Sequence, residues 1–68
     1  MNNKIKKDLV SIIIRTKNEE NWIVSCLNAI MQQNYKKFEI IIVDNFSNDK
    51  TINLAKKFPV KILKIKKF

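Results

Sequence analysis

The sequence predicts a small α/β protein with a three-stranded parallel sheet, built in the order strand, helix, strand, helix, strand. Two apolar runs rich in β-branched residues occupy residues 9–14 and 38–43, and neither run alternates with polar residues. A stretch with helical spacing of its apolar residues lies between them, at residues 18–34. Runs that are apolar throughout suit strands buried on both faces, as in parallel sheets.

The first strand is expected near residues 9–15 and the first helix near residues 19–33. Apolar residues of this helix recur in pairs four positions apart, which places them on one stripe. The stripe consists of Trp22, Ile23, Cys26, Leu27, Ile30 and Met31. Packing in a core explains all six positions, including the single cysteine.

Polar residues mark both ends of the first helix. Asn18 is expected to be the N-cap, followed by Glu19 and Glu20 in the first turn, where negative charge suits the helix dipole. Asn34 is expected to end the helix in a left-handed conformation.

The second half of the chain repeats the alternation. A strand is expected near residues 38–43, a helix near 48–57 and a third strand near 60–65. Ser47 or Asn48 is expected to cap the second helix, and Pro59 ends it. Right-handed crossovers between sequential strands would put both helices on one face of the sheet. The other face would then be apolar and uncovered, which predicts marginal stability and self-association, and indicates either part of a larger domain or a dimer.

Composition excludes several classes of site. The 68 residues contain no Gly and no His, which removes glycine-rich phosphate loops, His-containing zinc sites and the Ser-His-Asp triad. One Cys excludes an internal disulfide. The formal net charge is +8, from 14 Lys+Arg against 6 Asp+Glu. The lysines are scattered, and 13 Lys, 12 Ile and 9 Asn are what A/T-rich codons produce, so we do not expect a nucleic-acid partner.

We divide the chain into a basic N-terminal tail, residues 1–8, and a partial nucleotide-binding domain, residues 9–68. The longest apolar run is too short for a signal-peptide core or a membrane span. The expected location is therefore cytoplasmic, at the inner face of the membrane in a longer form.

Ligands of open parallel sheets bind outside the carboxyl ends of the strands. Arg15, Thr16 and Lys17 follow the first strand, and they offer a hydroxyl and positive charge suited to phosphate. Asp44 follows the second strand and could accept hydrogen bonds from a base or a ribose. The alternative is that Asp44 caps the next turn and Thr16 satisfies local backbone. A receiver-like domain with Asp44 as phosphoacceptor is disfavoured because no acidic pair follows the first strand.

Longer motifs point to one family. The chain reads VSIIIRTKNEE at residues 10–20, QNY at 33–35, FEIIIVDNFSNDKT at 38–51 and LAKK at 54–57. These segments resemble, in order, the V-S-I-I-I-P-T-Y-N-E-E opening, the Q-T-Y, the F-E-I-I-V-V-D-D-G-S-T-D-G-T and the second-helix end of family-2 glycosyltransferases with a GT-A fold. The resemblance covers the chain from residue 9 onward and implies half of a Rossmann-like nucleotide-binding domain.

The resemblance implies transfer of a sugar from a nucleotide-diphosphate donor to an acceptor hydroxyl, in cell-surface polysaccharide or glycan synthesis. It implies a nucleotide site formed by Arg15, Thr16, Lys17, Glu19, Asp44 and Asn45. In this family, the ligands of a divalent Mn or Mg ion and the catalytic-base Asp lie further along the chain. We therefore expect no catalytic residue and no metal ligand here, and no sugar transfer by the chain alone. The alternative is a small basic module that binds nucleic acid or an anionic membrane.

The chain departs from the family text at several of these positions. Arg15 and Lys17 replace Pro and Tyr, which removes an aromatic contact and adds positive charge, and Asn45 replaces a second Asp. Phe46 and Lys50 replace Gly. A bulky residue is strained at positive φ, so we expect the backbone at Phe46 and Lys50 to leave the left-handed region.

Overall fold

A computed structural model describes residues 9–66 and confirms the predicted order of elements. The predicted basic tail, residues 1–8, lies outside the described residues. The elements are β1 (Val10–Thr16), α2 (Ile23–Met31), β2 (Phe38–Asp44), α3 (Thr51–Ala55) and β3 (Val60–Lys64).

The three strands form one parallel sheet in the order β1-β2-β3, with β2 at the centre. The register pairs Val10 with Phe38 at one end and Thr16 with Asp44 at the other. Each strand boundary lies within one residue of the predicted one, because the apolar runs and the pairing cover the same residues. The fold class is therefore confirmed.

The first helix is shorter than predicted, because residues 18–22 form a turn before it. The Glu19 carbonyl accepts hydrogen bonds from the backbone N–H groups of Trp22 (3.1 Å) and Ile23 (3.0 Å). Trp22, not Asn18, occupies the N-cap position, and no acidic residue lies in the first turn. The predictions for Asn18, Glu19 and Glu20 were wrong. The side chains of Asn18 and Glu20 bind the loop after β2 instead, and the Glu19 side chain accepts from Trp22 Nε1.

Two further end predictions were also wrong. Asn34 does not end the helix in a left-handed conformation, because α2 already ends at Met31 with Gln32 in a right-handed conformation. Neither Ser47 nor Asn48 caps the second helix, whose first residue is Thr51. Lys50 occupies the N-cap position without a side-chain capping bond, and the backbone N–H of Thr51 donates to Asp49 Oδ1 at 2.9 Å.

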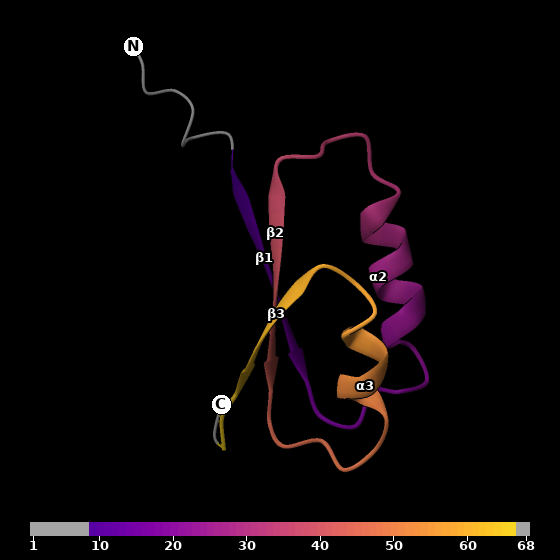
Figure 1. The fold of residues 1–68 in the computed structure, drawn as a ribbon, viewed down its shortest axis with the longest axis vertical. Coiled ribbons are helices and arrows are strands. Elements are labelled where there is room, and N and C mark those ends of the chain that lie inside the picture. Colours follow the sequence, from indigo (N-terminus) through magenta and orange to yellow (C-terminus); the bar gives the residue numbers. More distant parts are fainter. Residues whose placement is uncertain (1–8, 67–68) are drawn as a thin grey trace.

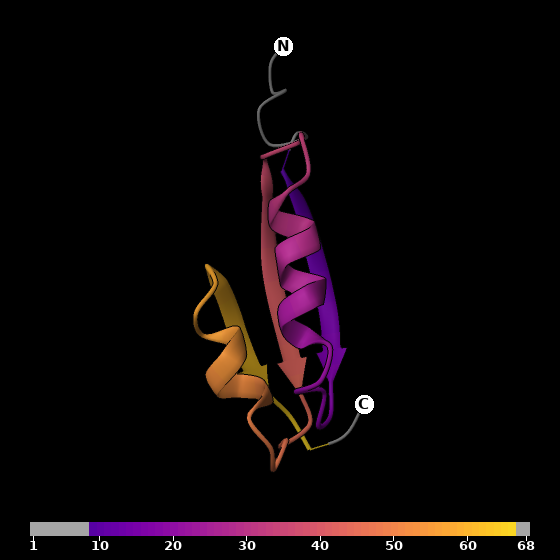
Figure 2. The ribbon, with the colours of Figure 1, turned by 90° about the vertical axis from the view of Figure 1, so that its right-hand side faces the viewer.

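Both helices cover the same face of the sheet, as the crossover rule predicts (Figures 1 and 2). The fully buried hydrophobic side chains come from α2, β2 and α3. They are Ile23, Leu27, Ile40, Ile42 and Ala55. The core therefore lies between the central strand and the two helices.

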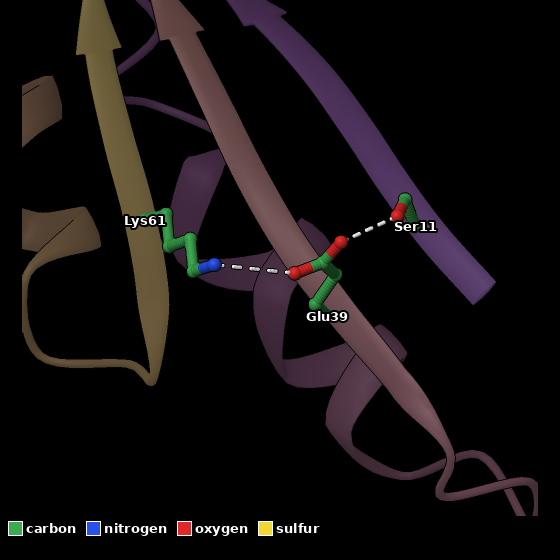
Figure 3. A network of polar contacts seen from close by, with 3 residues as sticks. All are labelled: Ser11, Glu39 and Lys61. Carbon is green, nitrogen blue, oxygen red and sulfur yellow. Dashed lines mark hydrogen bonds and ion pairs between the residues drawn. The ribbon is translucent and has the colours of Figure 1, made fainter. Parts of the chain in front are cut away.

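No helix of the described chain covers the opposite face of the sheet (Figure 1). Ile13 and Leu63 lie on this uncovered face with 62% and 55% of their surface exposed. A polar row crosses it: Ser11 Oγ donates to Glu39 Oε2 at 2.5 Å, and Lys61 Nζ lies 3.4 Å from Glu39 Oε1 (Figure 3). Among the described residues, the predicted uncovered face is present, with apolar positions beside one charged row.

Candidate functional site

Two loops meet at the edge of the sheet where the strands end, here named the carboxyl-end edge. They are residues 17–22, after β1, and residues 45–50, after β2, and both lie at the lower end of the sheet in Figure 1. The backbone N–H of Asn45 donates to the Thr16 carbonyl at 3.0 Å, which continues the strand pairing into the loops. The parallel register therefore brings together the two segments that the sequence singled out.

Asp44 is fully buried at this edge, and both of its carboxylate oxygens accept hydrogen bonds. Oδ1 accepts from Thr16 Oγ1 and from Ser47 Oγ, each at 2.6 Å, and Oδ2 accepts from the Ser47 N–H at 2.8 Å. Burial would raise the pKa of Asp44, but the bonds from Ser47 and Thr16 and the charge of Lys64 outweigh it and hold the pKa below its usual value. The carboxylate therefore stays ionised and holds β1 to the start of the second loop.

Ser47 and Asn18 extend this contact from one loop to the other. The Asn18 N–H donates to Ser47 Oγ at 2.8 Å, and the Asn48 N–H donates to Asn18 Oδ1 at 2.7 Å. Asn18 adopts φ 56°, a left-handed conformation that Asn tolerates better than most residues. These bonds join positions about thirty residues apart in the sequence.

A second group of bonds joins the same loops closer to the helices. The Glu19 N–H donates to Thr51 Oγ1 at 2.7 Å, and the Glu20 N–H donates to Asp49 Oδ2 at 3.2 Å. In return, the Lys50 N–H donates to Glu20 Oε1 at 2.9 Å. Although burial opposes it, hydrogen bonds from Thr51 and Glu20 lower the pKa of Asp49. The N-terminal ends of α2 and α3 are thus tied to each other through side chains.

Exposed basic and aromatic residues lie at this edge beside exposed asparagines. Lys17 Nζ donates to the Phe46 carbonyl at 3.2 Å. Phe46 adopts φ 49° and leaves 46% of its surface exposed. The expectation that its backbone would leave the left-handed region was therefore wrong, because the neighbouring bonds hold the turn. Lys50, at φ −86°, has left that region as expected.

The six residues predicted for the nucleotide site are only partly brought together. Thr16, Lys17, Asp44 and Asn45 lie at the carboxyl-end edge, and Glu19 joins them through its backbone. With its amide nitrogen toward β3, Asn45 donates to the carbonyls of Lys66 (2.8 Å) and Ile65 (3.0 Å).

Arg15 is the exception among the predicted residues. It is exposed, pairs with Val43 and alternates with Thr16, so it lies on the uncovered face of β1. Its guanidinium therefore belongs to a different surface from the buried Thr16–Asp44 pair.

Sequence reasoning missed three residues that hold this edge, namely Asn18, Ser47 and Asp49. All three are residue types whose side chains bind nearby or facing backbone groups. The cluster of Asn, Ser and Asp in residues 44–49 was a signal for such turns. The sequence showed no pairing between the two loops, since that depends on the register.

The described residues do not form a metal site. No group of three or more His, Cys, Asp and Glu side chains lies close enough to hold an ion within residues 9–66. The four carboxylates at the edge already accept hydrogen bonds. Asp44 accepts from Thr16 and Ser47, and Asp49 accepts from Thr51. Glu20 accepts from the Lys50 N–H, and Glu19 accepts from Trp22 Nε1. The donor set present therefore does not fit a divalent cation. In the same range, no helix has the length and hydropathy needed to cross a membrane.

Comparison with known proteins gives a consistent result. Residues 11–67 match the sequence profile of glycosyl transferase family 2. The chain is 45% identical over 51 residues to "Glycosyltransferase AglE" of Haloferax volcanii, an alignment that covers 72% of this chain and 17% of that protein. It is 35% identical over 54 residues to "Poly(ribitol-phosphate) beta-N-acetylglucosaminyltransferase TarS" of Staphylococcus aureus, covering 76% of this chain and 9% of that protein.

A third relative has a longer name and a similar match. It is the "Dolichyl N-acetyl-alpha-D-glucosaminyl phosphate 3-beta-D-2,3-diacetamido-2,3-dideoxy-beta-D-glucuronosyltransferase" of Methanococcus voltae, 43% identical over 56 residues. That alignment covers 79% of this chain and 17% of the relative. The chain thus spans less than a fifth of the length of these three relatives.

Proposed function

This chain belongs to glycosyl transferase family 2, and from that premise we propose that its carboxyl-end edge binds the nucleotide of a sugar-nucleotide donor. The observation that carries the proposal is the set of side-chain bonds between the loops after β1 and β2. Those bonds hold exposed basic and aromatic groups at the edge where open parallel sheets bind ligands.

The burial of each predicted residue supports a division of roles. Thr16 and Asp44 are buried and hydrogen-bonded to each other, so we propose that their role is to hold the two loops together. The resemblance assigns base recognition to Asp44. The oxygens of Asp44 already accept hydrogen bonds from Thr16 and Ser47. We therefore propose that the base is recognised by neighbouring residues of the loop that Asp44 holds.

Positive charge at this edge suits the diphosphate. Lys17 is exposed, and its ammonium donates to the carbonyl of Phe46, a residue of the second loop. A lysine binds phosphate as a compact charge whose side chain can swing toward the ligand. We propose that Lys17 contacts the diphosphate and that Arg15, on the other face, does not.

The larger reaction is also a proposal. Two relatives are named for transfer of sugars to a poly(ribitol phosphate) or to a dolichyl-linked sugar phosphate, which supports a role in cell-surface glycan synthesis. We propose that this role is carried out at the cytoplasmic side of the membrane. A divalent ion would neutralise the leaving diphosphate in such a reaction, but the described residues do not supply its ligands. We therefore propose that the 68-residue chain binds nucleotide without transferring sugar, and a turnover assay with Mn²⁺ or Mg²⁺ tests this.

The binding proposal is tested by titrating uridine diphosphate into the 68-residue chain and measuring the heat of binding. Lys17→Gln should weaken binding several-fold, because one phosphate contact is lost. Lys56→Gln is the matched control, since Lys56 is an exposed lysine at the opposite end of α3. Equal affinity of Lys17→Gln and the unchanged chain would contradict the assignment of Lys17, and no binding at all would contradict the proposed function.

The uncovered face supports a further proposal, that two copies of this chain associate through it. On this face Ile13 lies between the Glu39 row and Arg15, and Leu63 lies level with Arg15 across the sheet. A two-fold axis across the strands would bring the Arg15 end of one copy onto the Glu39 end of the other, whereas an axis along the strands would oppose like charges. Sedimentation should show a dimer that Ile13→Lys dissociates; a monomer at all concentrations would contradict this.

A further inference from the structure

Phe46 has two features that destabilise the fold, a disfavoured backbone conformation and an exposed aromatic ring. Its backbone has φ 49°, where a residue with a bulky side chain is disfavoured and glycine is not. The residue is also 46% exposed, and Phe46 is absent from the hydrophobic cluster between the helices and the sheet. Strained backbone of this kind persists only where the surroundings over-determine it, and it concentrates at ligand sites.

The surroundings of Phe46 do over-determine its conformation. On one side, the Asn45 N–H is bonded to the Thr16 carbonyl at 3.0 Å. On the other side, the Ser47 N–H is bonded to Asp44 at 2.8 Å. Lys17 adds a bond to the Phe46 carbonyl itself. The backbone of Phe46 is therefore held from three directions, and the ring projects from a fixed turn.

We propose that the ring of Phe46 is the stacking platform for the base of the nucleoside diphosphate, an inference that rests on the nucleotide-binding function proposed above. An exposed aromatic ring stacks on the face of any base, and such stacking tolerates different bases. Lys17, whose ammonium donates to the carbonyl of the same residue, places positive charge on the same turn as the ring. One turn therefore presents the two chemistries of a nucleotide ligand, an aromatic face for the base and a cation for the phosphates.

This assignment makes stability and binding respond in opposite directions to one substitution. Phe46→Gly relieves the left-handed strain and removes an exposed apolar ring, so the melting temperature should stay the same or rise. The same variant loses the stacking surface, so its affinity for nucleotide should fall. If the ring served only the fold, Phe46→Gly would lower the melting temperature of the protein.

The experiment measures the affinity of the full 68-residue chain for uridine diphosphate and, separately, for inorganic pyrophosphate. Phe46→Leu should weaken uridine diphosphate binding roughly five- to hundredfold, the range that one lost base–aromatic stack produces, and leave pyrophosphate binding unchanged. Phe46→Tyr should retain the affinity. Tyr35→Leu is the matched control, because Tyr35 is an aromatic residue with the same 46% exposure in the loop at the other end of the sheet.

The outcomes separate this inference from the function beneath it. If the unchanged chain binds neither ligand, the proposed function fails and the stacking role fails with it. If Lys17→Gln weakens uridine diphosphate binding while Phe46→Leu does not, the nucleotide site stands and the stacking role is overturned. If Phe46→Leu weakens pyrophosphate and nucleotide binding equally, the ring acts on the shape of the loop, which also overturns the stacking role.

Discussion

The two ends of the sheet are built differently. At the carboxyl-end edge, side chains tie two loops that lie about thirty residues apart in the sequence. At the opposite edge, here named the amino-end edge and formed by residues 32–37 and 56–59, several bonds are local. Lys36 Nζ donates to the Met31 carbonyl, and the Phe58 N–H donates to the Ala55 carbonyl. A backbone bond from the Val10 N–H to the Lys37 carbonyl, at 3.0 Å, joins distant positions at this edge.

The difference supports the proposal that the ligand binds at the carboxyl-end edge. Local turns close a connection and leave its outer surface able to vary. Bonds between two loops fix the relative position of every group on them, which is what a binding site requires of its supporting residues. The polar residues of the carboxyl-end edge therefore use their hydrogen bonds to hold the two loops in place. The exposed groups are the ones available to a ligand.

The largest expected effect comes from removing the carboxylate that joins the loops. Asp44→Ala leaves the hydroxyls of Thr16 and Ser47 and one N–H without their charged acceptor in a buried place. Each such bond is worth about 1.5–3 kcal/mol, and a small domain has only about 3–5 kcal/mol in total. We expect Asp44→Ala to lose cooperative thermal unfolding in circular dichroism.

The control for this prediction is another carboxylate on the same strand. Glu39 is half-buried on the uncovered face and pairs with Lys61 across 3.4 Å, so Glu39→Ala should cost far less. Equal melting temperatures for Asp44→Ala and Glu39→Ala would mean that the loops do not depend on Asp44.

A smaller loss is expected from Ser47→Ala. The hydroxyl donates to Asp44 and accepts from the Asn18 N–H, so the substitution breaks one link between the loops while the backbone bond to Asp44 stays. We expect a cost of about 1–3 kcal/mol in urea unfolding. Asn53→Ala, an exposed position of α3, is the comparison and should stay within about 0.5 kcal/mol. A cost for Ser47→Ala no greater than that of Asn53→Ala would show that the loops are held by backbone bonds alone.

The strands were predictable because the ends of apolar runs such as residues 38–43 coincide with the ends of the strands. The β-branched residues in these runs favour a strand over a helix. The helix ends were not, because Asn18 and Glu20 look like capping residues when read locally. Their bonds go to Asn48, Asp49 and Lys50, and only the register of β1 against β2 brings those partners within reach. Phe46 was misjudged for the same reason, since the strain at its φ was visible in the sequence and the bonds that hold it were not.

The dependence of stability on pH should also distinguish the carboxyl-end edge from the uncovered face. Hydrogen bonds hold the pKa values of Asp44 and Asp49 below their ordinary 3.8 in the folded chain. The stability they contribute is therefore fully present above pH 3.8 and is lost as the pH falls through the lower folded pKa values. Unfolding measured from pH 6 downward should show this loss. Glu39, whose pKa is lowered by Ser11 and Lys61, contributes in the same direction from the uncovered face.

Substitution distinguishes these carboxylates. Asp44→Asn should flatten the acid limb of the stability curve more than Glu39→Gln, because Asp44 is buried and Glu39 is partly solvated. An acid limb that is unchanged in Asp44→Asn would mean that its carboxylate is no better solvated by the protein than by water.

The smallest expected effect is also the most selective, because the two edges carry a matched pair of lysines. Lys17 Nζ donates to the Phe46 carbonyl at 3.2 Å, and Lys36 Nζ donates to the Met31 carbonyl at 3.0 Å, both in exposed places. Each bond competes with water, so Lys17→Ala and Lys36→Ala should each change the free energy of unfolding by no more than about 1 kcal/mol. Only Lys17→Ala should weaken pyrophosphate binding in calorimetry, since only that ammonium lies in the loops that Asp44 holds. If both variants weakened it equally, the net charge of +8 would be attracting the anion without a site, and the distinction between the two edges would not extend to binding.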